Sequence, residues 1–260
     1  MRRPRAPLTP VWHRARGLPA GWADIVERNV LMWPTLDDGE HARLEDAADW
    51  LLRHKHWEAA HGFDLTDEMR VTIAIQAALL VLGLGVDEYR EVSAVVVHPT
   101  TMLSHGPAPG PVPGTLTDEA VWLLGQAHDA RGPVLLAWDR VRDSARRPGR
   151  GDNVVFHEFA HKLDMVNHVL DGTPLLHSRR DVARWVAVCT EVYDALRAGA
   201  DRPPLRDYAA TNTAEFFAVA TEAFFDASIE LERNEPDLYD VLRGYYEQDP
   251  AARARRAGMA

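Results

Sequence analysis

Residues 157–161 read His157-Glu158-Phe159-Ala160-His161, and the rest of the chain is best interpreted outward from this pentapeptide. On an α-helix the two histidines lie four residues apart on one face, so both imidazoles can bind one metal ion. Glu158 follows the first histidine directly, and its carboxylate can reach a water on that ion without ligating the ion. The pentapeptide therefore predicts a helix that carries two zinc ligands and a general base, as in zinc peptidases.

The flanking residues predict a helix with one buried face. Gly151 and Asp152 supply a turn, and Asn153 supplies a capping side chain ahead of the helix. The buried face is predicted from apolar residues at helical spacing, Val155, Phe159, Leu163 and Val166. The histidines fall on the opposite side, which could also be an ordinary solvated face. We favour a metal site, because two histidines and two acidic residues occupy offsets compatible with ligation.

A catalytic zinc site needs a third protein ligand and leaves its fourth position to water. The extended motif HExxHxxGxxH is absent, because Asp164 stands at the glycine position and Asn167 at the last histidine. The third ligand should therefore be a carboxylate on a later helix. Spacing does not choose among the three downstream candidates, Glu191, Glu215 and Glu222.

Two long stretches resemble the signatures of a known family. They read NVVFHEFAHKLD over residues 153–164 and DYAATNTAEFFAV over residues 207–219, the second followed by TEAFF over 221–225. Both are similar to motifs of the Mlc titration factor A (MtfA) family of bacterial zinc peptidases. Shorter matches occur at residues 62–65, 71–84, 133–138 and 245–250, so the resemblance covers about residues 20 to 250.

The resemblance implies a ligand set. In that family the metal is held by the two histidines of HExxH and by the glutamate of the later motif, which matches Glu215 here. One Zn²⁺ per chain bound by His157, His161 and Glu215 is therefore expected. The alternative for Glu215 is a capping box with Asn212 as the N-cap of the same helix.

Three other acidic residues have roles that the sequence leaves open. Asp164 is either an acceptor that orients a ligating imidazole or an ordinary last-turn or surface carboxylate. Glu222 lies two helical turns after Glu215. It is either a partner of the metal site or part of a salt bridge. Glu191 belongs to an amphipathic stretch over 182–196 and is expected to be solvated.

Tyr208 precedes Glu215 by seven residues, and its phenol could donate a hydrogen bond to the oxyanion when water attacks a peptide carbonyl. The metal-site portion also resembles the catalytic domain of anthrax lethal factor, where a tyrosine precedes the ligand glutamate similarly. Packing against a buried helix is the alternative role of this tyrosine.

In the expected mechanism Glu158 takes the proton of the water and delivers it to the leaving amine.

The resemblance also implies function. It implies peptidase activity of aminopeptidase type on peptide substrates, together with a regulatory contact to the glucose repressor Mlc, a transcriptional regulator of enterobacteria. Two other classes stay open: a non-catalytic regulator-binding protein on a zincin fold, and a zinc hydrolase of a non-peptide amide. The intact Glu158 argues against the first of these, because a purely structural metal site needs no general base.

Composition is that of an ordinary globular enzyme. The chain has 260 residues, 46% of them hydrophobic, which is enough for one good core. Its net charge of −10, from 29 basic and 39 acidic residues, argues against direct nucleic-acid binding. Cys189 is the only cysteine, so no disulfide can form within the chain, which suits a cytoplasmic location. The most apolar stretch, residues 71–84, is too short to span a membrane and is expected to be a buried helix.

The expected fold class is α+β: a mainly helical, zincin-like metallopeptidase domain with a small β-sheet before the HExxH helix. We expect a single domain over residues 21–250, a flexible basic tail over 1–20 and a flexible C-terminal tail over 251–260.

Helices are predicted at 22–32, 40–60 and 67–83, the last capped by Thr66, and the chain from about 153 onward should be mainly helical. Strands are predicted at 91–97, 133–138 and 120–124, with a mobile loop over 104–114. Strand 133–138 is either internal or a sheet edge that could hold an extended peptide.

Overall fold

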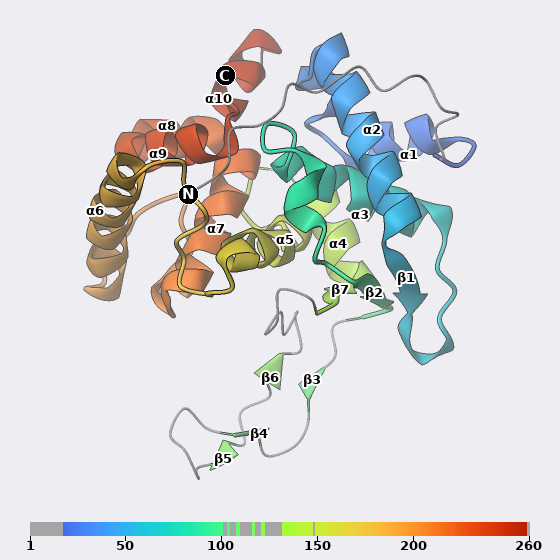
Figure 1. Ribbon diagram of the computed structural model, residues 1–260, viewed down its shortest axis with the longest axis horizontal. Helices are drawn as coiled ribbons and strands as arrows, with labels where there is room; N and C mark the ends of the chain where they lie inside the picture. Colours follow the sequence, from blue (N-terminus) through green and yellow to red (C-terminus); the bar gives the residue numbers. More distant parts are fainter. Residues whose placement is uncertain are drawn as a thin grey trace.

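The computed structural model describes residues 18–100, 103–104, 108–109, 116–117, 121–122, 132–147 and 149–258. Helices form most of this described part (Figure 1). The α-helices are α1 (Trp22–Asn29), α2 (Asp38–His54), α3 (Asp67–Leu80), α4 (Trp138–Arg146), α5 (Val154–Asp164), α6 (Arg179–Arg197), α7 (Thr213–Asp226), α8 (Ser228–Asn234), α9 (Pro236–Tyr246) and α10 (Pro250–Arg256). The 3₁₀ helices are η1 (Trp33–Thr35), η2 (Ala60–Gly62), η3 (Val86–Tyr89), η4 (Met165–Asn167) and η5 (Asp207–Ala210). The expected mainly helical class is confirmed.

A small parallel sheet precedes the HExxH helix, as expected. Its strands, in spatial order, are β1 (His56–Ala59), β2 (Ala94–His98) and β7 (Val134–Ala137). Val95 and Val97 of β2 pair with Val134 and Leu136 of β7, and all four side chains are buried because alternate residues of a strand share one face. Within the described strands β7 therefore forms one edge of this sheet, and it leads directly into α4.

Two short antiparallel pairs lie between β2 and β7 in the sequence. They are β3 (Leu103–Ser104) with β6 (Val121–Trp122), and β4 (Ala108–Pro109) with β5 (Leu116–Thr117). The strand predicted at 120–124 is described only over Val121–Trp122. The other residues of that strand, and most of the loop predicted at 104–114, lie outside the described residues.

The helix predicted over 40–60 is shorter than expected and is followed by a strand that the sequence analysis missed. Helix α2 ends at His54, and residues 56–59 pair with β2 as β1. The buried ammonium of Lys55 donates hydrogen bonds to the carbonyl oxygens of Tyr89 (2.6 Å) and Arg90 (3.3 Å). These contacts join segments about 35 residues apart, so helical periodicity around residue 55 does not reveal them.

Helix α3 is the buried helix that the apolar stretch predicted. The Thr66 side chain accepts a hydrogen bond from the Met69 backbone N–H and begins the helix, which confirms the predicted cap. The helix ends at Leu80 rather than at residue 83, and α1 likewise ends at Asn29 rather than at residue 32. Gly83 then passes close to the end of α9, where a Cβ atom would lie 2.3 Å from the Tyr246 carbonyl oxygen. Only glycine fits this approach without displacing backbone.

The predicted flexible C-terminal tail is wrong over most of its length. Residues 250–256 form α10, in which Ala251 and Arg253 are buried. Arg253 donates to Glu40 of α2 at 2.6 Å and 2.8 Å, so its charge is neutralised inside the fold rather than by solvent. The sequence did not reveal this contact, because the two partners lie 213 residues apart. Of the predicted N-terminal tail, residues 1–17 lie outside the described residues.

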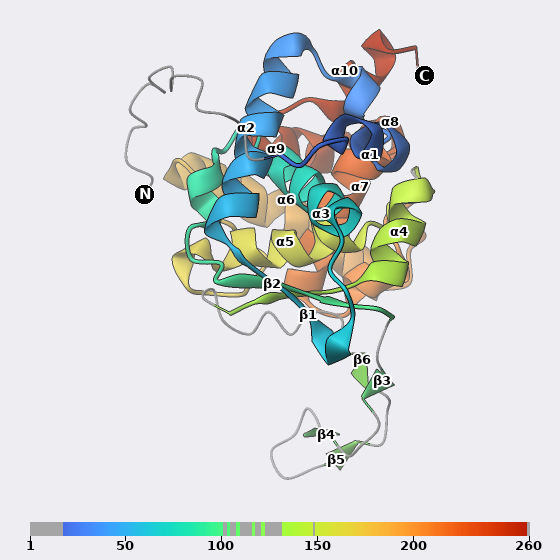
Figure 2. The ribbon, with the colours of Figure 1, turned by 90° about the vertical axis from the view of Figure 1, so that its right-hand side faces the viewer.

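Helix α5, which carries the HExxH residues, lies inside the molecule. It packs against α3, α7 and β7, and Figure 2 shows it between the sheet and the remaining helices. Every residue of the helix except His157 is buried. The alternative of an ordinary solvated face opposite Val155 is therefore wrong.

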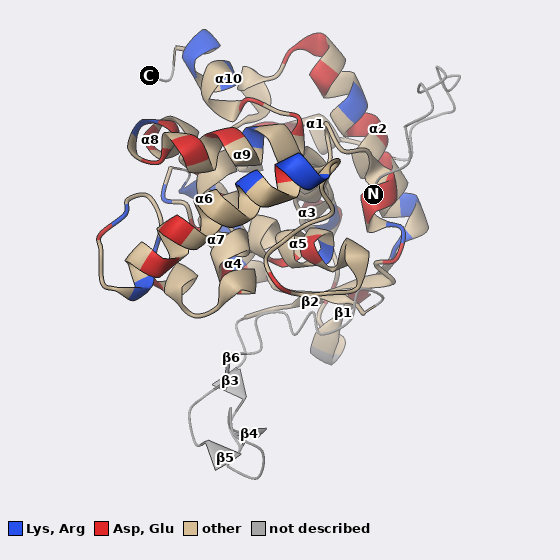
Figure 3. Cartoon of the chain, turned by 60° about the vertical axis from the view of Figure 1, so that its left-hand side comes forward, with Lys and Arg blue, Asp and Glu red and all other residues tan. Residues whose placement is uncertain are grey.

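The outer surface carries charges of both signs. In the view of Figure 3, acidic and basic residues are interspersed along α2 and α9. This face therefore has no single sign, although the whole sequence carries a net charge of −10. Among the described helices, none combines the length and the apolar character needed to cross a membrane.

Candidate metal centre

The start of α5 is fastened to two other helices. The Asn153 side chain accepts hydrogen bonds from the backbone N–H groups of Val155 and Phe156, which confirms it as the N-cap. Its Nδ2 donates to Gln76 of α3 at 2.8 Å, and its backbone N–H donates to Glu222 of α7 at 2.5 Å. The position of the HExxH residues is therefore set by α3 and α7 as well as by α5.

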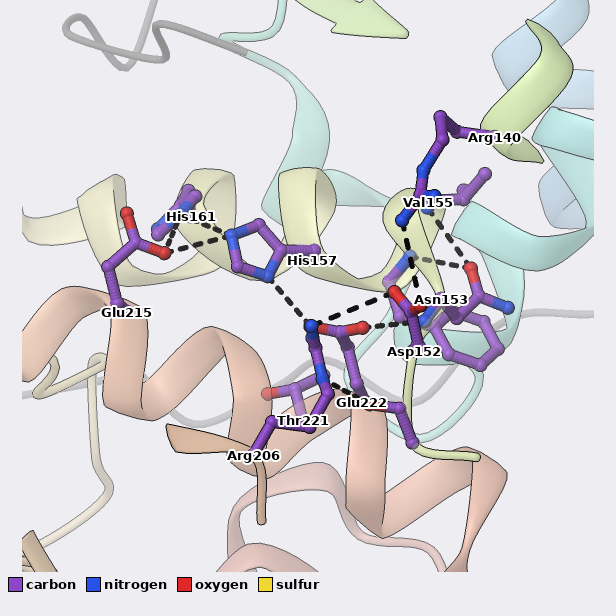
Figure 4. A network of polar contacts seen from close by, with 12 residues as sticks. Arg140, Asp152, Asn153, Val155, His157, His161, Arg206, Glu215, Thr221 and Glu222 are labelled. Carbon is purple, nitrogen blue, oxygen red and sulfur yellow. Dashed lines mark hydrogen bonds and ion pairs between the residues drawn. The ribbon is translucent and has the colours of Figure 1, made fainter. Parts of the chain in front are cut away.

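Three potential ligand atoms converge between α5 and α7. Nε2 of His157 lies 3.2 Å from Nε2 of His161, and Oε2 of Glu215 lies 2.9 Å and 3.5 Å from these two nitrogens (Figure 4). Helical spacing brings the histidines together, and Glu215 reaches them from the first turn of α7. Two imidazole nitrogens and a carboxylate oxygen that face one point form a donor set that fits a zinc ion.

Of the three carboxylates that spacing left open, only Glu215 joins this cluster. Asn212 does cap α7, with its side chain accepting from the Glu215 backbone N–H at 2.9 Å. The Glu215 carboxylate, however, faces the histidines rather than the N-cap backbone. The backbone N–H of Glu215 thus takes part in capping, and its carboxylate is left available as a metal ligand. Glu191 is exposed on α6, as expected of a solvated residue.

Burial and hydrogen bonding together determine the pKa values of His157, His161 and Glu215. Burial alone would lower the pKa of His157, but its hydrogen bonds to Glu215 and Glu222 raise it to about 10. Burial lowers the pKa of His161. Burial opposes ionisation of Glu215, yet the two imidazoles hold the pKa of its carboxyl well below the usual range. The cluster thus holds a positive charge beside a carboxylate, and a bound cation would take the place of the His157 proton.

Glu158, which the motif predicts as the general base, is 2% exposed. Burial raises the pKa of its carboxyl to about 8, and the nearby carboxylates of Glu215 and Glu222 contribute to the rise. Its Oε2 atom is buried and has no hydrogen-bond donor within the described part of the chain. A carboxylate in such surroundings has a high proton affinity and an acceptor atom not engaged by the protein.

Glu222 contacts the imidazole of His157 and also forms an ion pair with Arg206, so both roles that the sequence left open apply to it. Its carboxylate is 1% exposed, and Oε1 lies 2.7 Å from Nδ1 of His157. The same oxygen accepts from Nη2 of Arg206 at 2.6 Å (Figure 4). A carboxylate on Nδ1 favours the tautomer that leaves Nε2 free for a metal ion.

Asp164 lies in the last turn of α5, as one of its two interpretations held, but it is neither at the surface nor an acceptor for a ligand imidazole. It is 0% exposed, so it is not a surface carboxylate, and its Oδ2 accepts from the Gly172 backbone N–H at 2.8 Å. Nδ1 of His161 has no hydrogen-bond partner among the described residues, so Asp164 does not orient that imidazole. Burial raises the pKa of the Asp164 carboxyl to about 7. The residue fastens the loop that follows the metal helix.

Gly172 joins the ends of the two ligand helices. Its φ angle is +78°, and a Cβ atom there would lie 2.2 Å from the Thr213 carbonyl oxygen at the start of α7. Its backbone N–H donates to Asp164, and its carbonyl oxygen accepts from Nε1 of Trp185 at 3.0 Å. The sequence analysis missed this glycine, since only the tertiary fold brings Thr213 against it.

Tyr208 lies on η5 beside the cluster. Its side chain is 49% exposed, and its ring centroid is 6.0 Å from that of His157. Partial burial, together with the Glu215 carboxylate, raises the pKa of the phenol to about 12. The phenol therefore keeps its proton at neutral pH and can donate it in a hydrogen bond to a bound group.

The mainly helical fold and the His-His-Glu donor set are consistent with a metallopeptidase-type domain. The sequence model of the family described as glucose-regulated metallo-peptidase M90 matches residues 3–247, and the chain belongs to this family.

Relatives agree with that membership. An uncharacterized protein of Synechocystis sp. is 35% identical, over 90% of this chain and 86% of the relative. Mlc titration factor A of Pectobacterium atrosepticum is 35% identical, over 85% of this chain and 83% of the relative. Mlc titration factor A of Yersinia pestis is 32% identical, over 98% of this chain and 90% of the relative. The resemblance inferred from the two sequence motifs is confirmed.

Proposed function

We propose that the chain is a zinc-dependent peptidase whose single Zn²⁺ is held by His157, His161 and Glu215. The observation that carries the proposal is the convergence of two Nε2 atoms and one carboxylate oxygen beside the buried Glu158. When bound there, zinc supplies a Lewis acid for the substrate carbonyl and lowers the pKa of a coordinated water toward about 7.

The proposed steps use the surrounding side chains. Glu158 accepts the proton of the attacking water and transfers it to the leaving amine, for which a raised pKa is suited. Tyr208 donates a hydrogen bond to the developing oxyanion, since its phenol is protonated and partly exposed beside His157. The zincin-like mechanism and the aminopeptidase type follow from the family resemblance.

We further propose that the peptide backbone is held in an extended form along β7. This strand forms an edge of the described sheet and packs against α5. The unpaired backbone groups of an edge strand can add an extended peptide as a further strand, which would align a scissile bond relative to the metal helix.

Replacement of Glu158 by Gln tests the catalytic proposal. The amide keeps nearly the same volume but cannot accept the proton, so the variant should fold and retain about one zinc per chain. Loss of general-base catalysis should lower turnover by about 10²–10⁴-fold. Zinc content by elemental analysis and cleavage of a panel of peptides and non-peptide amides, with and without chelator, would be measured on both proteins. Full activity of Glu158→Gln would rule out the mechanism, and exclusive cleavage of non-peptide amides would change the substrate class.

A second function is proposed from the relatives. Two of them carry the name Mlc titration factor A, which points to an interaction with the repressor Mlc in those organisms. We propose that this chain binds a repressor of the same kind, where its host has one. Such binding involves no proton transfer, so Glu158→Gln should bind the repressor as tightly as the wild type. A regulator-binding protein without catalytic activity would show this binding but no zinc-dependent cleavage in either protein.

A further inference from the structure

Arg206 connects three segments around the metal centre. It immediately precedes η5, and its Nη2 donates to Oε1 of Glu222 on α7 at 2.6 Å. Its Nε donates to the Gly151 carbonyl oxygen at 3.0 Å, in the turn that precedes α5. Its Nη1 also lies 3.7 Å from Oδ1 of Asp152 (Figure 4). One planar guanidinium thus joins α7, the turn before α5 and the start of η5.

The Glu222 carboxylate depends on these contacts. A carboxylate that is 1% exposed is unfavourable unless hydrogen-bond donors surround it. Its donors are the Asn153 backbone N–H, Nδ1 of His157 and Nη2 of Arg206, and only the last brings a permanent positive charge. Without Arg206, Oε1 would keep only Nδ1 of His157 as its partner and would lose the permanent positive charge beside it.

We infer that Arg206 is a positioning residue of the metal centre: it fixes the Glu222 carboxylate, which in turn fixes the orientation and tautomer of His157. The imidazole then presents Nε2 toward His161 and Glu215. Because Arg206 lies two residues before Tyr208, the same contact also anchors the 3₁₀ helix that carries the phenol. The inference rests on the metal site of the proposed function but does not depend on the reaction that occurs there.

Arg202 provides a matched comparison. It lies in the same loop, its side chain is 29% exposed against 35% for Arg206, and it also binds a buried carboxylate. Its Nη1 lies 3.1 Å and 3.0 Å from the two oxygens of Glu235, just before α9 and outside the metal cluster. If both loop arginines had only a structural role, Arg206→Ala and Arg202→Ala would change zinc affinity equally.

Zinc affinity and the geometry of the bound ion test the inference. Arg206→Ala and Arg202→Ala would be compared with the wild type by zinc competition against a chelator and by the visible absorption spectrum of the cobalt(II)-loaded proteins. Loss of an outer partner of a metal ligand typically weakens metal binding 10–100-fold, so we expect a loss of about tenfold or more and a changed cobalt spectrum for Arg206→Ala. We expect Arg202→Ala to keep the wild-type affinity and spectrum, even though both variants unfold at lower denaturant concentration.

Several results would overturn the inference. Equal zinc affinity and equal cobalt spectra of the two alanine variants would assign Arg206 a structural role only. If Arg206→Ala does not fold, Arg206→Lys and Arg202→Lys decide in the same way, because lysine keeps the charge but not the planar pair of donors. Arg206→Lys should then bind zinc several-fold more weakly than Arg202→Lys. A wild type that binds zinc but cleaves no peptide would reject only the proposed catalysis, whereas a wild type that binds no zinc would reject both.

Discussion

Glutamates of this chain acquire different chemistry from their surroundings. Burial raises the pKa of Glu158 to about 8, whereas the two imidazoles lower the pKa of Glu215. Glu222, also buried, accepts hydrogen bonds from Asn153, His157 and Arg206, while Glu191 is exposed on α6. The residue type is the same in all four cases, so burial and charged neighbours decide which of them serves as base, ligand or orienting partner.

Asp164→Asn should become more stable relative to the wild type as the pH rises. The folded-state pKa of Asp164 is raised to about 7 by burial, against about 3.9 in an unfolded chain. Between these values the folded protein holds a proton that the unfolded chain has released, so wild-type stability falls with increasing pH by up to about 1.4 kcal/mol per unit. Asparagine does not titrate and keeps an acceptor for the Gly172 N–H. Urea unfolding of both proteins at pH 5 and pH 8 checks this, and a stability difference independent of pH would contradict it.

Gly172→Ala should destabilise the protein and weaken zinc binding. A Cβ atom there meets backbone at 2.2 Å, in addition to the unfavourable φ of +78°. We expect a loss of at least about 1–3 kcal/mol, because the loop must move away from Thr213, two residues before Glu215. Gly199→Ala is the control, since Gly199 has a φ of +86° and nothing within 4 Å of its Cβ position. Both would be measured by denaturant unfolding and zinc titration, and equal effects would show that the approach to Thr213 is unimportant.

At the scale of elements, the site depends on how α5 and α7 are held together. The Asn153 N–H bonds to Glu222 near the start of α5, and Asp164 and Gly172 connect its end to the start of α7. The helix that carries the two histidines of the cluster is thereby fixed at both ends to the helix that carries Glu215. Such fixing keeps the ligand atoms close together before an ion binds, which lowers the entropic cost of binding.

Glu215→Gln tests the contribution of α7. The amide is neutral and a poorer ligand than a carboxylate, so zinc affinity should fall by at least tenfold, with little change in helix content. Glu191→Gln makes the same chemical change on the exposed side of α6 and should leave zinc binding unaltered. Zinc content after dialysis and competition titration would distinguish the two variants. Strong zinc loss in Glu191→Gln but not in Glu215→Gln would overturn the assigned ligand set.

At the scale of the whole molecule, the C-terminal helix closes the fold against its N-terminal part. Helix α10 follows α9 in the chain (Figure 1). Its Arg253 binds Glu40 of α2. Gln248 adds hydrogen bonds to the Leu79 carbonyl oxygen at the end of α3 and to Arg253. Regions about 200 residues apart in the sequence are therefore in direct contact.

Arg253→Ala should lower the free energy of unfolding by about 3–5 kcal/mol, because it leaves the buried Glu40 carboxylate without its cation. Arg255→Ala, on the same helix, removes an exposed ion pair with Glu232 and should change the unfolding midpoint little. Both values come from urea denaturation followed by circular dichroism. A small effect of Arg253→Ala would mean that α10 is not part of the cooperative unit.

The sequence by itself determined the features that depend on neighbours along one helix. These are the i, i+4 pairing of His157 and His161, the adjacent Glu158 and the caps of α3 and α5, because helical geometry places residues three and four apart together. The long motif around Glu215 pointed to the third potential ligand through family resemblance, where spacing alone could not. Only the tertiary structure decided the roles of Asp164, Arg206, β1 and α10. Each of these depends on a partner distant in the sequence. Neither composition nor periodicity predicts which distant group will neutralise a buried charge, or which distant segment will pair with a strand.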